Sequence, residues 1–179
     1  MSVPRLDPMP ADRPLTLRSA RTQDVPVIQA LVEPLARERV LLQKEAVAYY
    51  EAIQEFVVAE ESEGTLAGFG ALHVMWQDIA EVRTLAVSEA HRGAGVGHLI
   101  IEELLDRARA VGVERVFCLT FEVEFFRRHG FEVMADQSAV DPEVYAELLR
   151  STDEGVAEFL DLARVKPNTL GNTRMIRRL

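Results

Sequence analysis

The sequence is poor in three features, and each absence excludes a class of protein. Cys118 is the single cysteine among 179 residues, so no disulfide can form within the chain. Basic residues are scarce, with 20 Lys and Arg against 29 Asp and Glu, and the formal net charge of −9 argues against a protein that grips the phosphate backbone of nucleic acids. No apolar run is long enough to cross a bilayer. We therefore expect no nucleic-acid partner and no membrane partner.

What the sequence does contain is typical of one folded domain. Hydrophobic residues make up 48% of the chain and charged residues 27%, which is enough apolar material for a core. Residues 1–14 hold four of the eight prolines and no apolar stretch of the kind that a signal peptide needs. We expect a flexible amino-terminal arm over 1–14, a single domain over 15–179 and a cytoplasmic location. Cys118 lies in an apolar run and is expected to be buried and inert.

The first half of the chain is predicted to form a strand, two helices and then three strands. Alternation at 15–18 indicates the first strand, and Thr22 is a candidate cap for a helix that Pro34 interrupts. A second helix is expected over 44–52. Short turn signals separate the next three strands, which predicts an antiparallel meander. These strands are expected at 55–60, 66–76 and 79–87.

The second half alternates helices and strands, which places the chain in the α/β class. Apolar residues at helical spacing predict a long amphipathic helix over 97–111. The segment 155–162 is compatible with either a helix or a strand. The remaining expected elements are a strand at 115–120, a helix at 125–129, a strand at 131–134, a helix from 142 to about 150 and a closing strand at 172–179.

The segment most indicative of chemistry is RGAGVGH at 92–98, between a strand and the long helix. Its alternating glycines let the backbone turn tightly and point successive N–H groups at one spot, where the helix dipole adds partial positive charge. Arg92 adds a fixed cation for phosphate oxygens. The spacing fits neither the Walker loop, G-x-x-x-x-G-K-[ST], nor the dinucleotide fingerprint, G-x-G-x-x-G. We therefore predict an anion cradle of another kind.

Together with its context, this loop resembles a known family. RGAGVG at 92–97 is similar to the R/Q-x-x-G-x-G/A pyrophosphate loop of the general N-acetyltransferase (GNAT) superfamily, and FFRRHGF at 125–131 resembles that family's later helix with its Gly-Phe end. The resemblance implies an α/β GNAT fold: a mixed, mostly antiparallel twisted sheet with splayed central strands, flanked by helices. It also implies acetyl-CoA as the co-substrate. The implied cofactor-binding residues are Leu85, Ala86, Val87, Arg92, Gly93, Ala94, Gly95, Val96, Gly97, His98 and Phe126.

Further blocks narrow the resemblance within that superfamily. They are YEAIQEF at 50–56, GALHV at 70–74, EVRT at 81–84, LTFE at 119–122, and VKPN followed by GNTRM within 165–175. Together they resemble the short, stand-alone amino-acid N-acetyltransferases that act as N-acetylglutamate synthases at the head of arginine biosynthesis. The implied reaction acetylates the α-amine of L-glutamate. The alternatives are another acceptor, such as glutamine, another amino acid or a peptide terminus, and a non-catalytic module that binds acyl-CoA.

An acetyl transfer to an amine needs a base, because an α-amine is still substantially protonated at neutral pH. Glu81 matches the family's usual base position, and alternation along the strand places Arg83 and Leu85 on its face. The other interpretation is a solvated or ion-paired strand carboxylate. Phe126 stands where many members carry a tyrosine that protonates the leaving thiolate. Glu122 could replace it through water, unless that carboxylate only favours a helix N-terminus.

An acidic acceptor needs local cations in a chain that is acidic overall. The expected substrate-binding residues are Lys44, Arg83, Asn172 and Arg174. Lys44 is otherwise a surface lysine, and Arg83 is otherwise a partner of Glu81. The resemblance places acceptor contacts in the closing strand, which holds the other two.

The chain offers no metal-binding motif by sequence. Its four histidines lack a spacing such as H-E-x-x-H, and one cysteine cannot build a zinc cluster, so we predict no metal. A closing strand at a sheet edge would allow two copies to pair, and a homodimer is therefore the one macromolecular partner that the sequence indicates.

Overall fold

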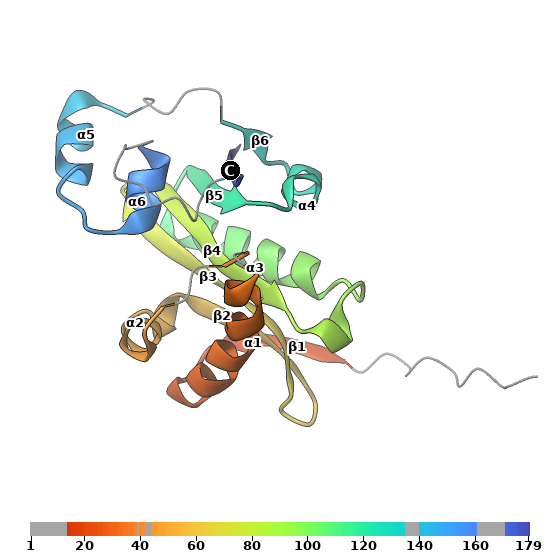
Figure 1. The fold of residues 1–179 in the computed structure, drawn as a ribbon. Coiled ribbons are helices and arrows are strands. Elements are labelled where there is room, and N and C mark those ends of the chain that lie inside the picture. Colours follow the sequence, from red (N-terminus) through yellow and green to blue (C-terminus); the bar gives the residue numbers. More distant parts are fainter. Residues whose placement is uncertain (1–13, 39, 42–43, 135–139, 161–170) are drawn as a thin grey trace, which may run out of the picture.

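The computed structural model describes residues 14–38, 40–41, 44–134, 140–160 and 171–179, which form one seven-stranded sheet covered by helices (Figure 1). The strand order is β1-β2-β3-β4-β5-β7-β6. All neighbouring strands are antiparallel except β4 and β5, which are parallel. The strands are β1 (Leu15–Ser19), β2 (Phe56–Glu61), β3 (Leu66–Trp76), β4 (Ile79–Val87), β5 (Arg115–Thr120), β6 (Glu132–Val133) and β7 (Thr173–Arg178). The predicted meander of β2, β3 and β4 is confirmed, whereas nearly all of the predicted arm lies outside the described residues.

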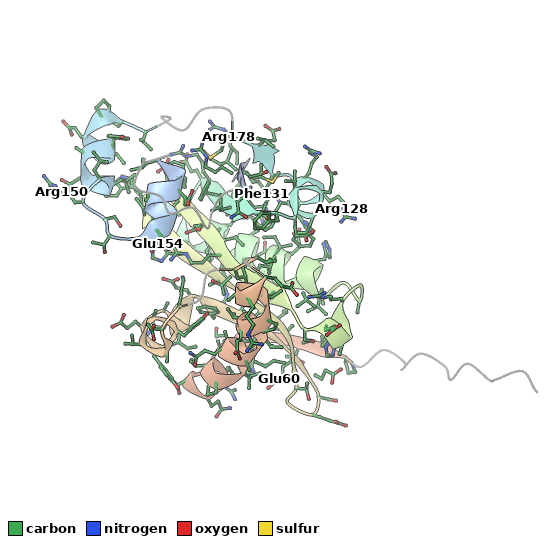
Figure 2. The ribbon with its side chains drawn as sticks, in the orientation of Figure 1. Glu60, Arg128, Phe131, Arg150, Glu154 and Arg178 are labelled. Atoms are coloured by element: carbon green, nitrogen blue, oxygen red, sulfur yellow. The ribbon has the colours of Figure 1, made fainter. Side chains whose placement is uncertain are left out.

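Helices cover both faces of the sheet. They are α1 (Val25–Arg37), α2 (Ala46–Glu51), α3 (Val96–Val111), α4 (Val123–Arg128), α5 (Pro142–Leu148) and α6 (Glu154–Phe159), and three 3₁₀ turns lie at Thr22–Asp24, Ile53–Glu55 and Glu89–His91. In Figure 1, α3 crosses behind the strands and α1 lies in front of them. Arg150 and Glu154, labelled in Figure 2, mark the two ends of the connection between α5 and α6.

Alternation along the strands divides the core into separate apolar clusters. Strand residues such as Ala80 and Val116 pack with α3 on one face. Their neighbours Ile79 and Phe117 point the other way and pack with α6. The front face near β2 and β3 packs with α1 and α2 instead. The helices on the front face of the sheet, called the front layer below, therefore form two groups over different strands. One group is α1 with α2, and the other is α5 with α6.

The sheet opens between β4 and β5. The two strands pair at Ile79↔Arg115, Ala80↔Val116 and Glu81↔Phe117, and no pairing between them follows. Beyond that point β4 pairs only with β3, while β5 continues beside β7. The splayed central strands that the family resemblance implies are thus present, and Glu81 is the last β4 residue before the strands part.

A bulge in β4 corrects one expectation about side-chain directions. Phe69 pairs with Ala86 and Ala71 pairs with Arg83, so two β4 residues stand opposite Gly70. Thr84 in this bulge has a φ of 55°, in the left-handed region. The extra residue shifts the alternation, and Leu85 packs with the α3 cluster instead of sharing the face of Glu81. The prediction for the Leu85 side chain was therefore wrong.

Three other local predictions need correction. Pro34 does not interrupt α1, because the helix continues to Arg37, and the exposed position lets water satisfy the carbonyl that proline leaves without a donor. Thr22 does not cap α1, because it is the first residue of a 3₁₀ turn that precedes the helix. The N-cap position of α1 is Asp24, whose carboxylate accepts from the Arg21 amide at 2.7 Å and so closes that turn. The closing strand β7 is also no edge, because it lies between β5 and β6, so the predicted route to a homodimer is lost.

Two further features agree with the sequence or settle what it left open. Residues 155–159 of the ambiguous segment are helical and belong to α6, whose Asp153 N-cap accepts from the Val156 amide at 3.1 Å, whereas residues 161 and 162 lie outside the described residues. Cys118 is fully buried. None of the described helices combines the length and apolar character needed to traverse a bilayer.

Candidate active site

A buried ion network lies where β4 leaves β5. The Glu81 side chain is directed to the front face, and only 7% of this residue is exposed. Arg83 donates to its Oε2 from Nε at 2.9 Å and from Nη2 at 2.6 Å. The same guanidinium donates to both oxygens of Asp153, from Nη1 at 3.0 Å and from Nη2 at 3.1 Å. Arg83 therefore holds two carboxylates that come from β4 and from the start of α6.

The beginning of α6 fits closely against Glu81. A Cβ built on Gly155 would lie 2.7 Å from Cδ of Glu81 and closer still to Oε2, well inside van der Waals contact. The helix can approach β4 this closely because residue 155 has no side chain. Glu81 Oε1 accepts no hydrogen bond from the described residues, so one carboxylate oxygen remains available to a water molecule or an amine.

The charges in this network shift the pKa values of its members. Burial raises the pKa of Glu81 above the ordinary value, and the neighbouring Arg83 only partly opposes this effect. Burial is the largest influence on Asp153 and acts to raise its pKa, but the hydrogen bonds and charge of Arg83, the Val156 amide and the nearby His73 together outweigh burial and lower the pKa. Glu81 is therefore the carboxylate whose proton affinity lies nearer to neutral pH, as a general base requires.

Two further groups join the network from β3 and from the segment before α2. His73 stands opposite Glu81 in the β3–β4 ladder, and its Nδ1 lies 2.6 Å from Oε1 of Glu55. Its Nε2 lies 3.8 Å from Oδ2 of Asp153. Lys44 is half-buried and within electrostatic reach of Glu81, Arg83 and Asp153; burial, reinforced by Arg83, lowers its pKa. Lys44, which was expected to bind the substrate, thus lies beside Glu81 and Arg83.

The glycine-rich loop has the geometry of an anion site. Gly93 and Gly95 have φ values of 81° and 80°, which favour glycine, and nothing lies within 4 Å of a Cβ built on either. Among the described residues, the amides of Gly93, Gly95 and residues 96–98 donate no hydrogen bond. These N–H groups lie at the N-terminus of α3, where the helix dipole favours an anion. Arg92 is exposed and forms no ion pair with a described residue.

The open edge of β4 runs toward that loop. Residues 85–87 follow the point where pairing with β5 ends, and Ala86 and Val87 pair only with β3. Their outward backbone groups can therefore pair with an extended ligand, as at any free strand edge. Gly97 packs against the ring of Phe125, at 3.3 Å for a built Cβ, which brings α4 against the start of α3.

The remaining predicted site residues are more scattered. Glu122 is exposed at the N-cap of α4. Phe126 is 5% exposed and packs in the core between Phe125 and Phe131, so its side chain offers little surface to a ligand. Arg174 donates to the Glu158 carbonyl of α6 at 3.4 Å, and Asn172 precedes β7 with a half-buried side chain. Among the described residues, the structure therefore shows direct contact or electrostatic coupling between Glu81, Arg83 and Lys44.

Sequence reasoning missed Asp153, His73 and Gly155. Asp153 carried a usable signal, because an Asp before an apolar stretch is a common helix cap. His73 lies in a block that was noted only for its resemblance. Nothing in the sequence places Gly155 against Glu81, because that contact joins segments far apart in the chain.

The comparisons with known proteins agree with this geometry. The sequence profile of the Acetyltransferase (GNAT) family matches residues 27–131. An amino-acid acetyltransferase of Mycobacterium tuberculosis is 52% identical over 169 residues, which cover 93% of this chain and 96% of that protein. An amino-acid acetyltransferase of Neisseria meningitidis is 32% identical over 124 residues, or 68% of this chain, but only 28% of the longer relative is covered.

Solved structures of similar proteins contain coenzyme A. A Mycobacterium tuberculosis protein in complex with CoA and NLQ superposes with a TM-score of 0.86 and 52% identity, over 92% of this chain and 99% of that chain. N-acetylglutamate synthase from Neisseria gonorrhoeae, complexed with coenzyme A and N-acetyl-glutamate, gives a TM-score of 0.74 and 26% identity. That match covers 94% of this chain and 36% of the synthase.

Proposed function

Because the chain belongs to the GNAT acetyltransferase family, with acetyl-CoA as its co-substrate, we propose that it acetylates the α-amine of L-glutamate. The products would be N-acetylglutamate and CoA, as in the first step of arginine biosynthesis. The main observation in support of acetyl transfer is the position of Glu81, a buried carboxylate with a raised pKa at the point where β4 and β5 separate. The Neisseria gonorrhoeae synthase supports glutamate as the acceptor.

In this proposal Glu81 prepares the nucleophile. Its Oε1 takes a proton from the acceptor ammonium, directly or through one water molecule, and the neutral amine attacks the thioester carbonyl carbon. The C–N bond forms first, giving a tetrahedral intermediate, and the C–S bond then breaks as this intermediate collapses, so the sulfur leaves as a thiolate. The nitrogen releases its remaining excess proton through water toward that thiolate. A backbone N–H at the open edge of residues 85–87 would stabilise the negative oxygen of the tetrahedral intermediate.

The coenzyme would be held by the loop and the strand edge. The unpaired amides of residues 93 and 95–98, together with Arg92, would bind the diphosphate, and the edge at 85–87 would pair with the extended pantetheine arm. Phe126 cannot donate a proton to the thiolate. The leaving group needs little help, because thiols have a reference pKa of about 8.5; Glu122, exposed at the start of α4, would return the proton through water.

Recognition of the acceptor would involve Lys44, Arg174 and Asn172. Lys44 lies beside Glu81, and Arg174 and Asn172 lie at the start of β7 near α6. Arg83 already forms ion pairs with both Glu81 and Asp153, which favours a role in positioning Glu81 over direct contact with a substrate carboxylate. This pairing also favours a second candidate acceptor, glutamine, whose side chain needs no cation.

A panel of amines separates these proposals. Thiol release from acetyl-CoA is measured with glutamate, glutamine, other amino acids, peptides with free N-termini and polyamines. Glutamate-dependent turnover supports the first proposal, and a higher kcat/KM for glutamine supports the second. Calorimetric binding of CoA without turnover for any amine would instead identify a non-catalytic binding module.

Replacing Arg92 by alanine is expected to raise the KM for acetyl-CoA about tenfold, because an exposed charge-assisted hydrogen bond to phosphate contributes roughly 1.5 kcal/mol. The kcat at saturating acetyl-CoA and the KM for the acceptor should change little. Arg150→Ala, an exposed arginine on the α5 side of the molecule, serves as the matched control. An unchanged KM for acetyl-CoA in Arg92→Ala would remove this residue from the phosphate site.

A further inference from the structure

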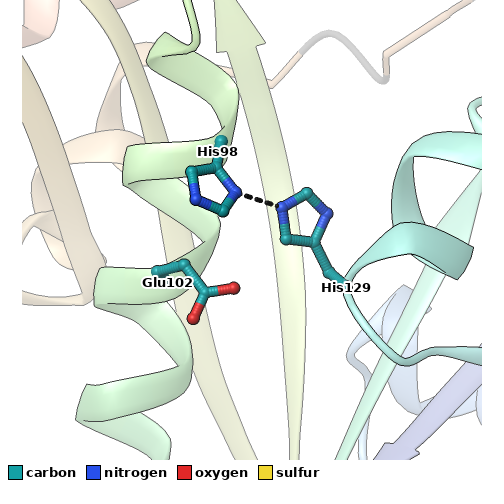
Figure 3. Close-up of side chains that lie close together, drawn as sticks. All are labelled: His98, Glu102 and His129. Atoms are coloured by element: carbon teal, nitrogen blue, oxygen red, sulfur yellow. Dashed lines mark hydrogen bonds between the residues drawn. The ribbon is translucent and has the colours of Figure 1, made fainter.

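A cluster of three metal-ligand side chains lies on the opposite face of the sheet from the Glu81 network. His98 and Glu102 belong to α3, and His129 directly follows α4 (Figure 3). One ligand atom from each lies within 4.8 Å of the others. We propose that these residues form a binding site for Zn²⁺ that joins α3 to the end of α4.

The position of each ligand follows from the fold. Residues i and i+4 share one face of a helix, so His98 and Glu102 point in the same direction from α3. His129 approaches that face because Phe125, one turn earlier in α4, packs against Gly97. The sequence predicted no metal because it offered no local ligand spacing, and spacing along one segment cannot reveal a ligand that another element supplies.

The protonation of His129 suits a metal ligand. Its Nδ1 lies 2.8 Å from the Phe125 carbonyl oxygen, which can only accept, so Nδ1 carries a proton. The neutral ring then has a lone pair on Nε2, the atom that faces His98. Metal-ligating histidines commonly donate their second N–H to a carbonyl or carboxylate in this way, which fixes the tautomer and the ring orientation. The His129 residue is 8% exposed, so its packing also restrains the ring.

Glu102 supplies the charge. Its carboxylate forms no ion pair and no hydrogen bond with the described residues, although it points toward the two imidazoles in Figure 3. A cation held by two neutral imidazoles and this carboxylate would gain a counter-charge without breaking an existing ion pair. This carboxylate outweighs the partial positive charge at the N-terminus of α3, which opposes a cation.

Only a small movement separates the metal-free arrangement from a coordinated one. His98 Nδ1 lies 2.7 Å from His129 Nε2 and donates a hydrogen bond to it. In a tetrahedral zinc site with Zn–N bonds of about 2.0–2.1 Å, two ligand nitrogens lie about 3.3 Å apart. The ion takes the place of the bridging proton, and the His98 ring then carries its proton on Nε2. His98 is exposed, which leaves a path for the ion and for a water molecule at a fourth position.

The chemical nature of the three ligand side chains determines which metal ion the site prefers. Two imidazoles and one carboxylate are a common ligand set for Zn²⁺, whereas Mg²⁺ prefers oxygen ligands alone. The site faces away from Glu81, so its side chains take no part in the proton transfer proposed above, whereas the backbone amide of His98 belongs to the loop proposed to bind the diphosphate. The effect of the ion is structural: it would fasten α4 to the first turns of α3, next to the glycine-rich loop.

The test measures binding of ZnCl₂ to the full chain, with any affinity tag removed, by calorimetry at pH 7.5 and at pH 5.5. We expect one Zn²⁺ per chain and no binding of MgCl₂. Affinity should be lower at pH 5.5, because protons compete with the metal ion for its ligand atoms. A 100-fold excess of Zn²⁺ over its Kd should raise the Tm by about 5 °C or more.

Variants on the solvent side of α3 locate the ion without disturbing the core. His98→Ala and Glu102→Gln should each weaken Zn²⁺ binding at least tenfold and reduce the Tm shift accordingly. Glu103→Gln, the adjacent carboxylate that pairs with Arg107, should bind Zn²⁺ as the unaltered chain does. Absence of zinc binding, or an equal Tm shift in all variants, would overturn the proposal and leave the histidines as a hydrogen-bonded pair. Because the readouts are binding and stability, neither outcome depends on acetyl transfer.

Discussion

Replacing Glu81 by glutamine is expected to lower kcat by roughly 100- to 10,000-fold, the range that a positioned general base contributes. Glutamine keeps the shape of the side chain but cannot accept the proton of the acceptor ammonium. The KM for acetyl-CoA should remain unchanged, because the loop at 92–98 lies on another part of the fold. Steady-state kinetics at saturating acetyl-CoA provide the measurement.

The pH profile tests the role of this carboxylate separately from its effect on structure. The base acts in its ionised form, so activity rises as the pH passes upward through the pKa of Glu81. Burial raises that pKa, and the rise should therefore occur above the ordinary value of 4.5. In Glu81→Gln this limb should disappear, and the residual rate should follow only the deprotonation of the amine at higher pH. Glu132→Gln, an exposed carboxylate of β6, is the control, and an unaltered profile in Glu81→Gln would exclude Glu81 as the base.

Introducing a methyl group at Gly155 should have the second-largest effect. The added Cβ would lie 2.7 Å from Cδ of Glu81, so the carboxylate or the start of α6 must move. A displacement of about 1 Å in a catalytic group can reduce the rate about 100-fold. We therefore expect Gly155→Ala to lower kcat by at least that factor while the protein remains folded, because alanine is a better helix former than glycine. Circular dichroism and kcat are measured on the same preparation.

A double-mutant cycle tests whether the loss of kcat in Gly155→Ala arises from the contact between residue 155 and Glu81. Glu81→Asp shortens the side chain and frees space, so adding Gly155→Ala to that variant should cost a smaller factor in kcat than adding it to the unaltered chain. Glu154→Ala, the preceding residue of α6, is the control for a change in the helix alone. Equal costs of Gly155→Ala in both backgrounds would mean that the added methyl acts elsewhere.

The spacing of apolar residues along the sequence predicts most of the helices and strands, because it identifies the face of each element that must be buried. The run 97–111 places its apolar residues on one side, and α3 buries that side as expected. The strands β3, β4 and β5 also match their predicted limits, since turn residues bound them closely. The glycine-rich loop could be located from sequence because its backbone adopts a left-handed conformation at particular positions, which glycine tolerates best. This conformation leaves amide groups of the loop without backbone partners among the described residues.

Interactions between distant segments could not be read in the same way. The bulge at Thr84 redirects Leu85, yet alternation alone gave no sign of the extra residue. The position of β7 between β5 and β6 is determined by the strands that pair with it, and the residues of β7 alone do not reveal it. Likewise, Asp153 joins Arg83 only after α6 docks on the sheet, so the sequence identified Glu81 without the partner that helps to hold it.

The two-part front layer has an evolutionary consequence. The stretch with the glycine-rich loop lies within the family match at 27–131, whereas Asp153, Gly155 and Arg174 lie beyond it. Under the proposed function, mutations in the later stretch would change the residues packed around Glu81 and Arg83 without altering the glycine-rich loop. Descendants of such a gene would then acquire new amines as substrates through changes in this later stretch.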